Sequence, residues 1–224
     1  MNSEQVEQMA QLEIACRFLY SALTHPPKQD FIYSLREDNL LNFWPVESPN
    51  KNVHEGLASM QHYLEGFHFS GSMQQLQDDF NALFIGPDSL KAAPWGSVYL
   101  SHEQLTFGES TLAVRRFYKK FNTVIYTGQQ EPDDHLGLML AFLSYLLQQG
   151  LQTIEQDEIA EFWLQACHEF LEEYTLTWSG RFLEIMKQAS KTSFYQGVAA
   201  LTMGTLEQLA ALTGAHYRIV PLFR

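Results

Sequence analysis

The chain has 224 residues, enough for one large domain or two small lobes, and its 16 Phe, 10 Tyr and 4 Trp make it rich in aromatic side chains. With 14 Lys and Arg against 26 Asp and Glu, the formal net charge of −12 disfavours nucleic acid and acidic membrane surfaces as partners and favours a basic or neutral one. Two distant cysteines, Cys16 and Cys167, and an acidic amino terminus predict a cytoplasmic protein without disulfide bonds, a secretory signal or membrane insertion.

Hydrophobic spacing predicts helices throughout the first third of the chain. The first helix is expected to stop before Pro26 and Pro27, because a residue before proline is pushed out of the helical region. Gly86 ends the fourth helix, whose polar residues Asp78 and Asp79 are expected to face solvent. The expected helices cover residues 3–23, 30–41, 53–67 and 71–85.

Residues 87–105 are expected to form a long ordered loop, because Pro87, Pro94 and Gly96 deny this segment helical continuity. The loop carries large apolar side chains, namely Trp95, Val98, Tyr99 and Leu100. A segment of this composition is expected to cross a core or to line a cleft. Core packing is the favoured explanation of these aromatic residues, and a groove for an apolar peptide is the alternative.

The next two helices differ in character. Ser110 is expected to cap a helix that reaches Phe121, and the basic outer side chains of this helix are interpreted as a solvated face. A central helix is expected to begin with residues 131–134, because proline suits the first helical position and carboxylates meet the positive end of the helix dipole. Residues 136–147 are apolar almost all round, so this helix is expected to be buried until Gly150 ends it.

The remainder of the chain continues the helical pattern. Further helices are expected over residues 154–174, 176–189 and 194–213. Ile159 is expected to face inward, and Gly214 ends the last helix. No alternating segment is long enough for a sheet, so the fold class is all-α, with about ten helices around the buried central helix.

Asp134 and His135 are the candidates for catalysis. A carboxylate can fix the tautomer of an imidazole for acid–base chemistry, but the same pair also suits a helix cap or a binding site for a basic ligand. Successive helical residues point about 100° apart, and no partner nucleophile is near in sequence, so capping or binding is favoured over catalysis. No His-Glu pair is followed by a second histidine at the spacing of a helical zinc site, so no metal is predicted.

Several short stretches of the chain resemble those of one known family. They are Phe-Ile-Gly-Pro at 84–87, Ala-Pro-Trp-Gly-Ser-Val-Tyr at 93–99, Phe-Gly-Glu-Ser-Thr-Leu at 107–112, Glu-Pro-Asp-Asp-His at 131–135 and Pro-Leu-Phe-Arg at 221–224. Together they resemble the TorD/DmsD family of cytoplasmic redox-enzyme maturation chaperones. The resemblance implies a single TorD-like domain over residues 1–224. An alternative organisation has lobes 1–121 and 131–224 joined by a hinge near 122–130.

The resemblance implies a chaperone and not an enzyme, with no cofactor of its own. Such a protein binds the twin-arginine leader of a molybdoenzyme precursor, of the dimethyl sulfoxide or trimethylamine oxide reductase type, and holds it for cofactor insertion before Tat export. The Tat export machinery is a further implied partner, and the chain is expected to be a monomer or a helix-exchanged dimer. The alternative function is a nucleotide-binding or hydrolytic enzyme that uses Asp134 and His135.

The resemblance also implies a leader-binding site. The matching residues here are Leu83, Phe84, Pro94, Trp95, Tyr99, Gly108, Pro132, Asp134 and His135, and we add Glu131. We expect Asp134, with help from Glu131, to meet the charge of the leader, because carboxylates bind arginine through charge-assisted hydrogen bonds. Trp95 and Phe84 are expected to receive its apolar stretch. Tyr99 stands where close members of the family carry tryptophan, which bears on leader preference.

Overall fold

The computed structural model describes residues 2–46, 49–87, 89–123, 131–156 and 159–224. The first part of the chain forms α1 (Ser3–Thr24), α2 (Gln29–Glu37), the 3-10 turn η1 (Leu40–Phe43), α3 (Lys51–Glu65), α4 (Phe69–Phe80) and the π-helical turn η2 (Asn81–Ile85). The second part forms α5 (Gly96–Leu100), α6 (Glu109–Lys120), α7 (Leu136–Glu155), α8 (Glu161–Phe170), the π-helical turn η3 (Leu171–Thr175), α9 (Ser179–Ala189) and α10 (Ser193–Thr213).

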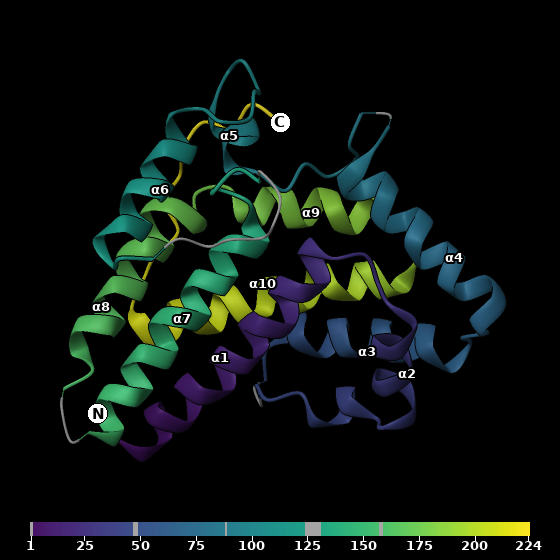
Figure 1. The fold of residues 1–224 in the computed structure, drawn as a ribbon, viewed down its shortest axis with the longest axis horizontal. Helices are drawn as coiled ribbons and strands as arrows, with labels where there is room; N and C mark the ends of the chain where they lie inside the picture. Colours follow the sequence, from purple (N-terminus) through teal and green to yellow (C-terminus); the bar gives the residue numbers. More distant parts are fainter. Residues whose placement is uncertain (1, 47–48, 88, 124–130, 157–158) are drawn as a thin grey trace.

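The prediction of an all-α domain with about ten helices is confirmed. Within the described ranges there is no β-strand, and one isolated antiparallel bridge joins Trp95 to His135. In Figure 1, α1, α7 and α10 pass through the middle of a single globular domain, with α2, α3 and α4 on one side and α5, α6 and α8 on the other. The described part of the chain contains no helix that is both long and apolar enough to cross a membrane.

The buried central helix is α7. Its inward side chains have no exposed surface, and they are Leu136, Met139, Leu140, Phe142, Leu143, Leu146 and Leu147. Burying each such side chain stabilises the fold by about 1.5–3 kcal/mol relative to leaving it in water. α1 packs along α7, and α10 packs against α3 and α9, so apolar faces meet throughout the domain. Both cysteines, Cys16 and Cys167, are buried and free.

Gly150 does not end α7, contrary to the prediction. The helix continues to Glu155, and Gly150 lies at the packed surface between α7 and α1. A Cβ atom at this position would lie 2.8 Å from the Cε atom of Met9 and 3.3 Å from the Cβ atom of Trp163. The glycine is therefore required by close packing between helices, which its position in the sequence does not reveal.

Asp79 was expected to face solvent, but the structure buries it. Its carboxylate is only 1% exposed and accepts hydrogen bonds from the backbone N–H of Lys191 at 3.0 Å and that of Thr192 at 2.8 Å. The Thr192 hydroxyl donates a third bond at 2.7 Å. Asp79 therefore holds the start of α10 through donors more than one hundred residues away, which local amphipathic patterning could not identify.

Several helix boundaries differ from those expected. The loop predicted over 87–105 contains the short helix α5, and the helix predicted over 154–174 begins only at Glu161. Ile159 is 81% exposed and not inward. Gly214 follows α10 with a φ of 73°, so the predicted end of that helix is confirmed. The division into two lobes stays a prediction, because most of its hinge, residues 124–130, falls outside the described residues.

Candidate functional site

Residues 131–135 form a turn and not the helix start that was expected. The His135 N–H donates to the Pro132 carbonyl at 3.0 Å, which closes the turn. α7 begins at Leu136, and His135 is its N-cap, with its Nδ1 atom accepting a hydrogen bond from the Gly137 N–H at 3.0 Å. Pro132 and the acidic residues predicted a helix start before His135. The helix begins after His135 because the imidazole accepts the capping hydrogen bond that a side-chain oxygen usually accepts.

This turn is joined to the segment that carries Trp95. The Leu136 N–H donates to the Pro94 carbonyl at 2.8 Å, and the Gly96 N–H donates to the Asp134 carbonyl at 3.1 Å. These two bonds flank the isolated bridge between Trp95 and His135. Two motifs that are about 35 residues apart in sequence are thus fixed side by side through their backbones.

The Asp134 carboxylate lies beneath this junction. It is 1% exposed, and it accepts hydrogen bonds from the Ser97 N–H at 2.6 Å and from the Thr111 hydroxyl at 2.7 Å. The Ser110 hydroxyl donates a longer bond at 3.3 Å. Ser110 does not cap α6, because Gly108 is the N-cap residue and Ser110 lies inside the helix. Asp134 therefore ties the starts of α5 and α6 to the turn before α7.

His135 is buried and neutral. It is 5% exposed, and burial lowers its pKa from 6.5 to about 3. Because Nδ1 accepts the Gly137 bond, the proton of the neutral ring is on Nε2. The ring lies edge-on to Trp95, with 6.2 Å between ring centroids. His135 thus offers a neutral hydrogen-bond donor beside an aromatic surface.

We expect the neutral state of His135 to make the protein less stable in acid. Between pH 6.5 and 3 the unfolded chain binds a proton on this residue that the folded protein does not. Stability that is complete above pH 6.5 is therefore lost as the pH falls, by about 2 kcal/mol at pH 5. Urea unfolding of the wild type and of His135→Gln at pH 7.5 and pH 5 measures this loss. The loss is expected to be about 2 kcal/mol smaller in the variant, and equal losses would contradict the assignment.

A cleft of about 310 Å³ opens beside Trp95 and His135. The indole Nε1 of half-buried Trp95 donates to a carboxylate oxygen of Glu131 at 3.1 Å. Phe84, from η2, forms another part of the wall. Among the residues predicted for the site, the structure thus brings Phe84, Trp95, Glu131 and His135 together at one cleft.

The other predicted site residues do not line this cleft. Leu83 and Tyr99 are completely buried, and Tyr99 stacks on Trp178 with 5.5 Å between ring centroids. Pro94 and Pro132 supply the carbonyl groups that accept from Leu136 and His135, as described above. Gly108 is the N-cap of α6, where an added Cβ would lie 3.6 Å from the Ser97 Cβ.

One wall of the cleft was not predicted from the sequence. It comes from the end of α1 and the two residues after it, from the last residue of α4 and from η2, and its residues are Leu23, Thr24, His25, Pro26, Phe80, Asn81 and Ile85. α1 comes close to α7 because Gly137 has no side chain, and a Cβ there would lie 2.5 Å from the Cγ2 atom of Thr24. The sequence feature that marks this wall is His25-Pro26-Pro27, which was interpreted only as the end of a helix.

The arrangement suits binding of a peptide with an apolar stretch and a cation. Aromatic and proline side chains supply apolar walls, and Glu131 supplies a carboxylate at the cleft. Asp134 and His135 make their hydrogen bonds to different neighbours, so the geometry does not assemble an acid–base pair. Within the described residues, no three His, Cys, Asp or Glu side chains gather in a way that could hold a metal ion.

The chain is similar to known proteins over most of its length. A model of the family described as nitrate reductase delta subunit matches residues 47–184. The probable Tat proofreading chaperone DmsD of Haemophilus influenzae is 32% identical over 204 residues, which are 89% of this chain and 90% of that protein. The Tat proofreading chaperone DmsD of Salmonella typhimurium is 30% identical over 207 residues, 92% of this chain and 90% of that protein. The chaperone protein TorD of Aliivibrio fischeri is 32% identical over 133 residues, 59% and 61% of the two chains.

Proposed function

This chain belongs to the TorD/DmsD family of redox-enzyme maturation chaperones, and we propose that it binds the twin-arginine leader of a molybdoenzyme precursor of the dimethyl sulfoxide or trimethylamine oxide reductase type. It holds this precursor in the cytoplasm until the cofactor has been inserted and then releases it for Tat export. The role requires a binding cleft and no catalytic group. The resemblance drawn from the sequence motifs agrees with the matches to chaperones over most of the chain.

The observation that carries this proposal is the pairing of Trp95 with Glu131 at the cleft beside Phe84. A leader presents arginine side chains next to an apolar stretch, and these two features need different partners. The Glu131 carboxylate binds a guanidinium group through charge-assisted hydrogen bonds, and the Trp95 face adds a cation–π contact. Phe84 and the apolar walls receive the neighbouring apolar side chains. The net charge of −12 also attracts a basic peptide.

The predicted site residues have two roles in this proposal. Phe84, Trp95, Glu131 and His135 contact the leader, because they line the cleft. The remaining residues hold these four in place, and they are Leu83, Pro94, Tyr99, Gly108, Pro132 and Asp134. We therefore assign the contact with leader charge to Glu131, and we assign to Asp134 the support of the turn that carries Glu131 and His135.

Co-purification from anaerobically grown cells tests the function. The tagged chain is expected to capture a reductase precursor whose amino-terminal leader is identified by mass spectrometry. A precursor without its leader, and a precursor with both arginines changed to lysine, serve as controls. Equal capture of the leaderless precursor would contradict leader recognition and would favour a scaffold that binds the folded enzyme or the Tat export machinery.

The rival function is a nucleotide-binding or hydrolytic enzyme that uses Asp134 and His135. Nucleotide turnover by the purified chain that is lost in His135→Ala, without loss of folding, would support this rival and contradict the chaperone proposal. Size-exclusion chromatography with light scattering, run with and without leader peptide, distinguishes a monomer from a helix-exchanged dimer.

A further inference from the structure

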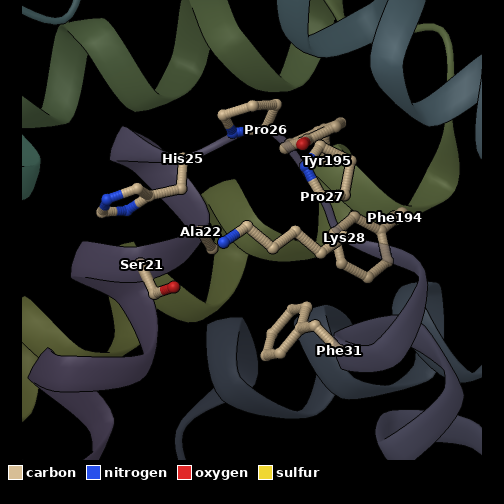
Figure 2. Close-up of a pocket in the computed structure, with 9 residues that line it drawn as sticks. All are labelled: Ser21, Ala22, His25, Pro26, Pro27, Lys28, Phe31, Phe194 and Tyr195. Carbon is tan, nitrogen blue, oxygen red and sulfur yellow. The ribbon is translucent and has the colours of Figure 1, made fainter.

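A second pocket, of about 250 Å³, adjoins the cleft. His25 and Pro26 line both hollows, so the two are separated only by the short segment that follows α1. Figure 2 shows the second pocket between the end of α1, the Phe31 side chain of α2 and the Tyr195 side chain of α10. Two aromatic side chains of its lining differ in exposure: Tyr195 is 1% exposed, and Phe31 is half-buried.

The exposed side chain of Lys28 supplies an ammonium to this pocket, and Ser21, His25 and Tyr195 supply further polar atoms. In Figure 2 the side chain of Lys28 extends across the pocket, and its nitrogen points towards Ser21 and Ala22. Among the residues that the structure describes, no ion pair joins Lys28 to a carboxylate, although the chain carries 26 Asp and Glu. An ammonium without an ion pair beside aromatic and proline side chains favours a ligand that has apolar side chains and oxygen acceptors.

The cleft and the second pocket carry side chains of opposite charge. Glu131 supplies a carboxylate to the cleft, and Lys28 supplies an ammonium to the second pocket. A cleft of 310 Å³ is at the lower end of the range of about 300–1,000 Å³ that single small-molecule ligands occupy, so it holds only a few side chains of a leader. A longer peptide bound at the cleft must continue along the protein surface, and the second pocket lies directly beyond His25 and Pro26.

We propose that the second pocket is a further subsite for the same leader and takes the apolar segment that follows the arginines. This inference rests on the proposed function and adds the direction of binding. The arginines lie at Glu131, the apolar segment passes His25 and Pro26, and its carboxyl-terminal carbonyl oxygens accept hydrogen bonds from Lys28. An ammonium is favourable there because the carboxyl-terminal end of a helical segment carries negative partial charge.

Two leader peptides of different length test the subsite. The short peptide contains the arginine region alone, and the long peptide adds the apolar segment. Fluorescence anisotropy is expected to give a Kd about tenfold lower for the long peptide with the wild-type chain. In Ser21→Leu, which fills the pocket, and in Lys28→Glu, this ratio is expected to fall to about twofold. Lys119→Glu makes the same charge change on the exposed face of α6, and the ratio is expected to stay near tenfold.

The outcomes separate this inference from the proposed function. A tenfold ratio that persists in folded Ser21→Leu and Lys28→Glu would overturn the subsite while leaving leader binding intact. Absence of binding by both peptides to the wild-type chain would instead contradict the proposed function and the subsite with it. Thermal unfolding followed by circular dichroism verifies that each variant is folded.

Photo-crosslinking tests the direction of binding independently of affinity. A benzophenone at the carboxyl-terminal end of the long peptide is expected to label Ser21, Ala22 or Lys28, which line the second pocket and not the cleft, within the tryptic fragment 18–28. Labelling of fragment 121–181 alone, which contains Glu131, would place that end at the cleft and overturn the proposed direction.

Discussion

Replacing Trp95 with alanine is expected to weaken leader binding by about thirtyfold or more. The indole forms a wall of the cleft and holds the Glu131 carboxylate through a bond of 3.1 Å, so its loss removes an apolar surface and frees the charge that we propose meets arginine. Truncation of a tryptophan at the centre of an interface typically costs about 2 kcal/mol or more, which corresponds to this range of Kd. Titration of a labelled leader peptide measures the change.

Two further variants separate the contribution of the Trp95 ring from that of its hydrogen bond to the Glu131 carboxylate. Trp95→Phe keeps an aromatic wall but removes the donor to Glu131, and Glu131→Gln keeps a polar side chain but removes the charge. Each is expected to weaken binding less than Trp95→Ala does, and Glu131→Gln is expected to reduce the salt dependence of the Kd. Unchanged affinity in a folded Trp95→Ala protein would remove this residue from the leader site.

Asp134→Ala is expected to lower the free energy of unfolding by about 3–5 kcal/mol. The buried carboxylate accepts bonds from the Ser97 N–H and from the hydroxyls of Thr111 and Ser110, and alanine leaves these donors without their acceptor. Each buried donor that loses its partner costs about 1–3 kcal/mol. Chemical denaturation at pH 7.5 measures the difference from the wild type.

The neighbouring Asp133 is the matched control for this substitution. It pairs with Arg115 at 2.7 Å, and the side chain of the arginine is 44% exposed and that of Asp133 17%. A partly exposed ion pair of this kind contributes about 1 kcal/mol, so Asp133→Ala is expected to be milder than Asp134→Ala. If Asp134→Ala proved no less stable than Asp133→Ala, the buried carboxylate would not hold α5, α6 and the turn before α7 together.

Much of the fold was predictable because helices are encoded locally. The apolar spacing of 136–147 predicted a buried central helix, and that prediction is confirmed by the side chains of α7. The error at Gly150 shows the limit of local patterns. A glycine inside a helix is indistinguishable in sequence from one that ends it, and only the approach of Met9 from α1 explains why a side chain is excluded.

The candidate site was predictable as a set of residues but not as an arrangement. Resemblance to a family selected Phe84, Trp95 and His135, and Glu131 was added to them for its charge; the structure brings these four residues to one cleft. The resemblance also selected Asp134, whose inward direction depends on donors from α5 and α6. No local pattern predicts these donors, because they are about 23 and 37 residues from Asp134 in the chain.

The sequence by itself determined the helical class, the buried helix α7 and the family, and it supplied the motifs of the candidate site, because periodicity and short motifs depend on neighbouring residues. Only the tertiary structure decided which motif residues reach the surface. In the structure, Asp134 is buried and holds neighbouring segments together, whereas Glu131 and Trp95 lie at the cleft. The end of α1 forms another wall of that cleft. The physical reason is that burial and hydrogen-bond partners come from segments that meet only when the helices pack.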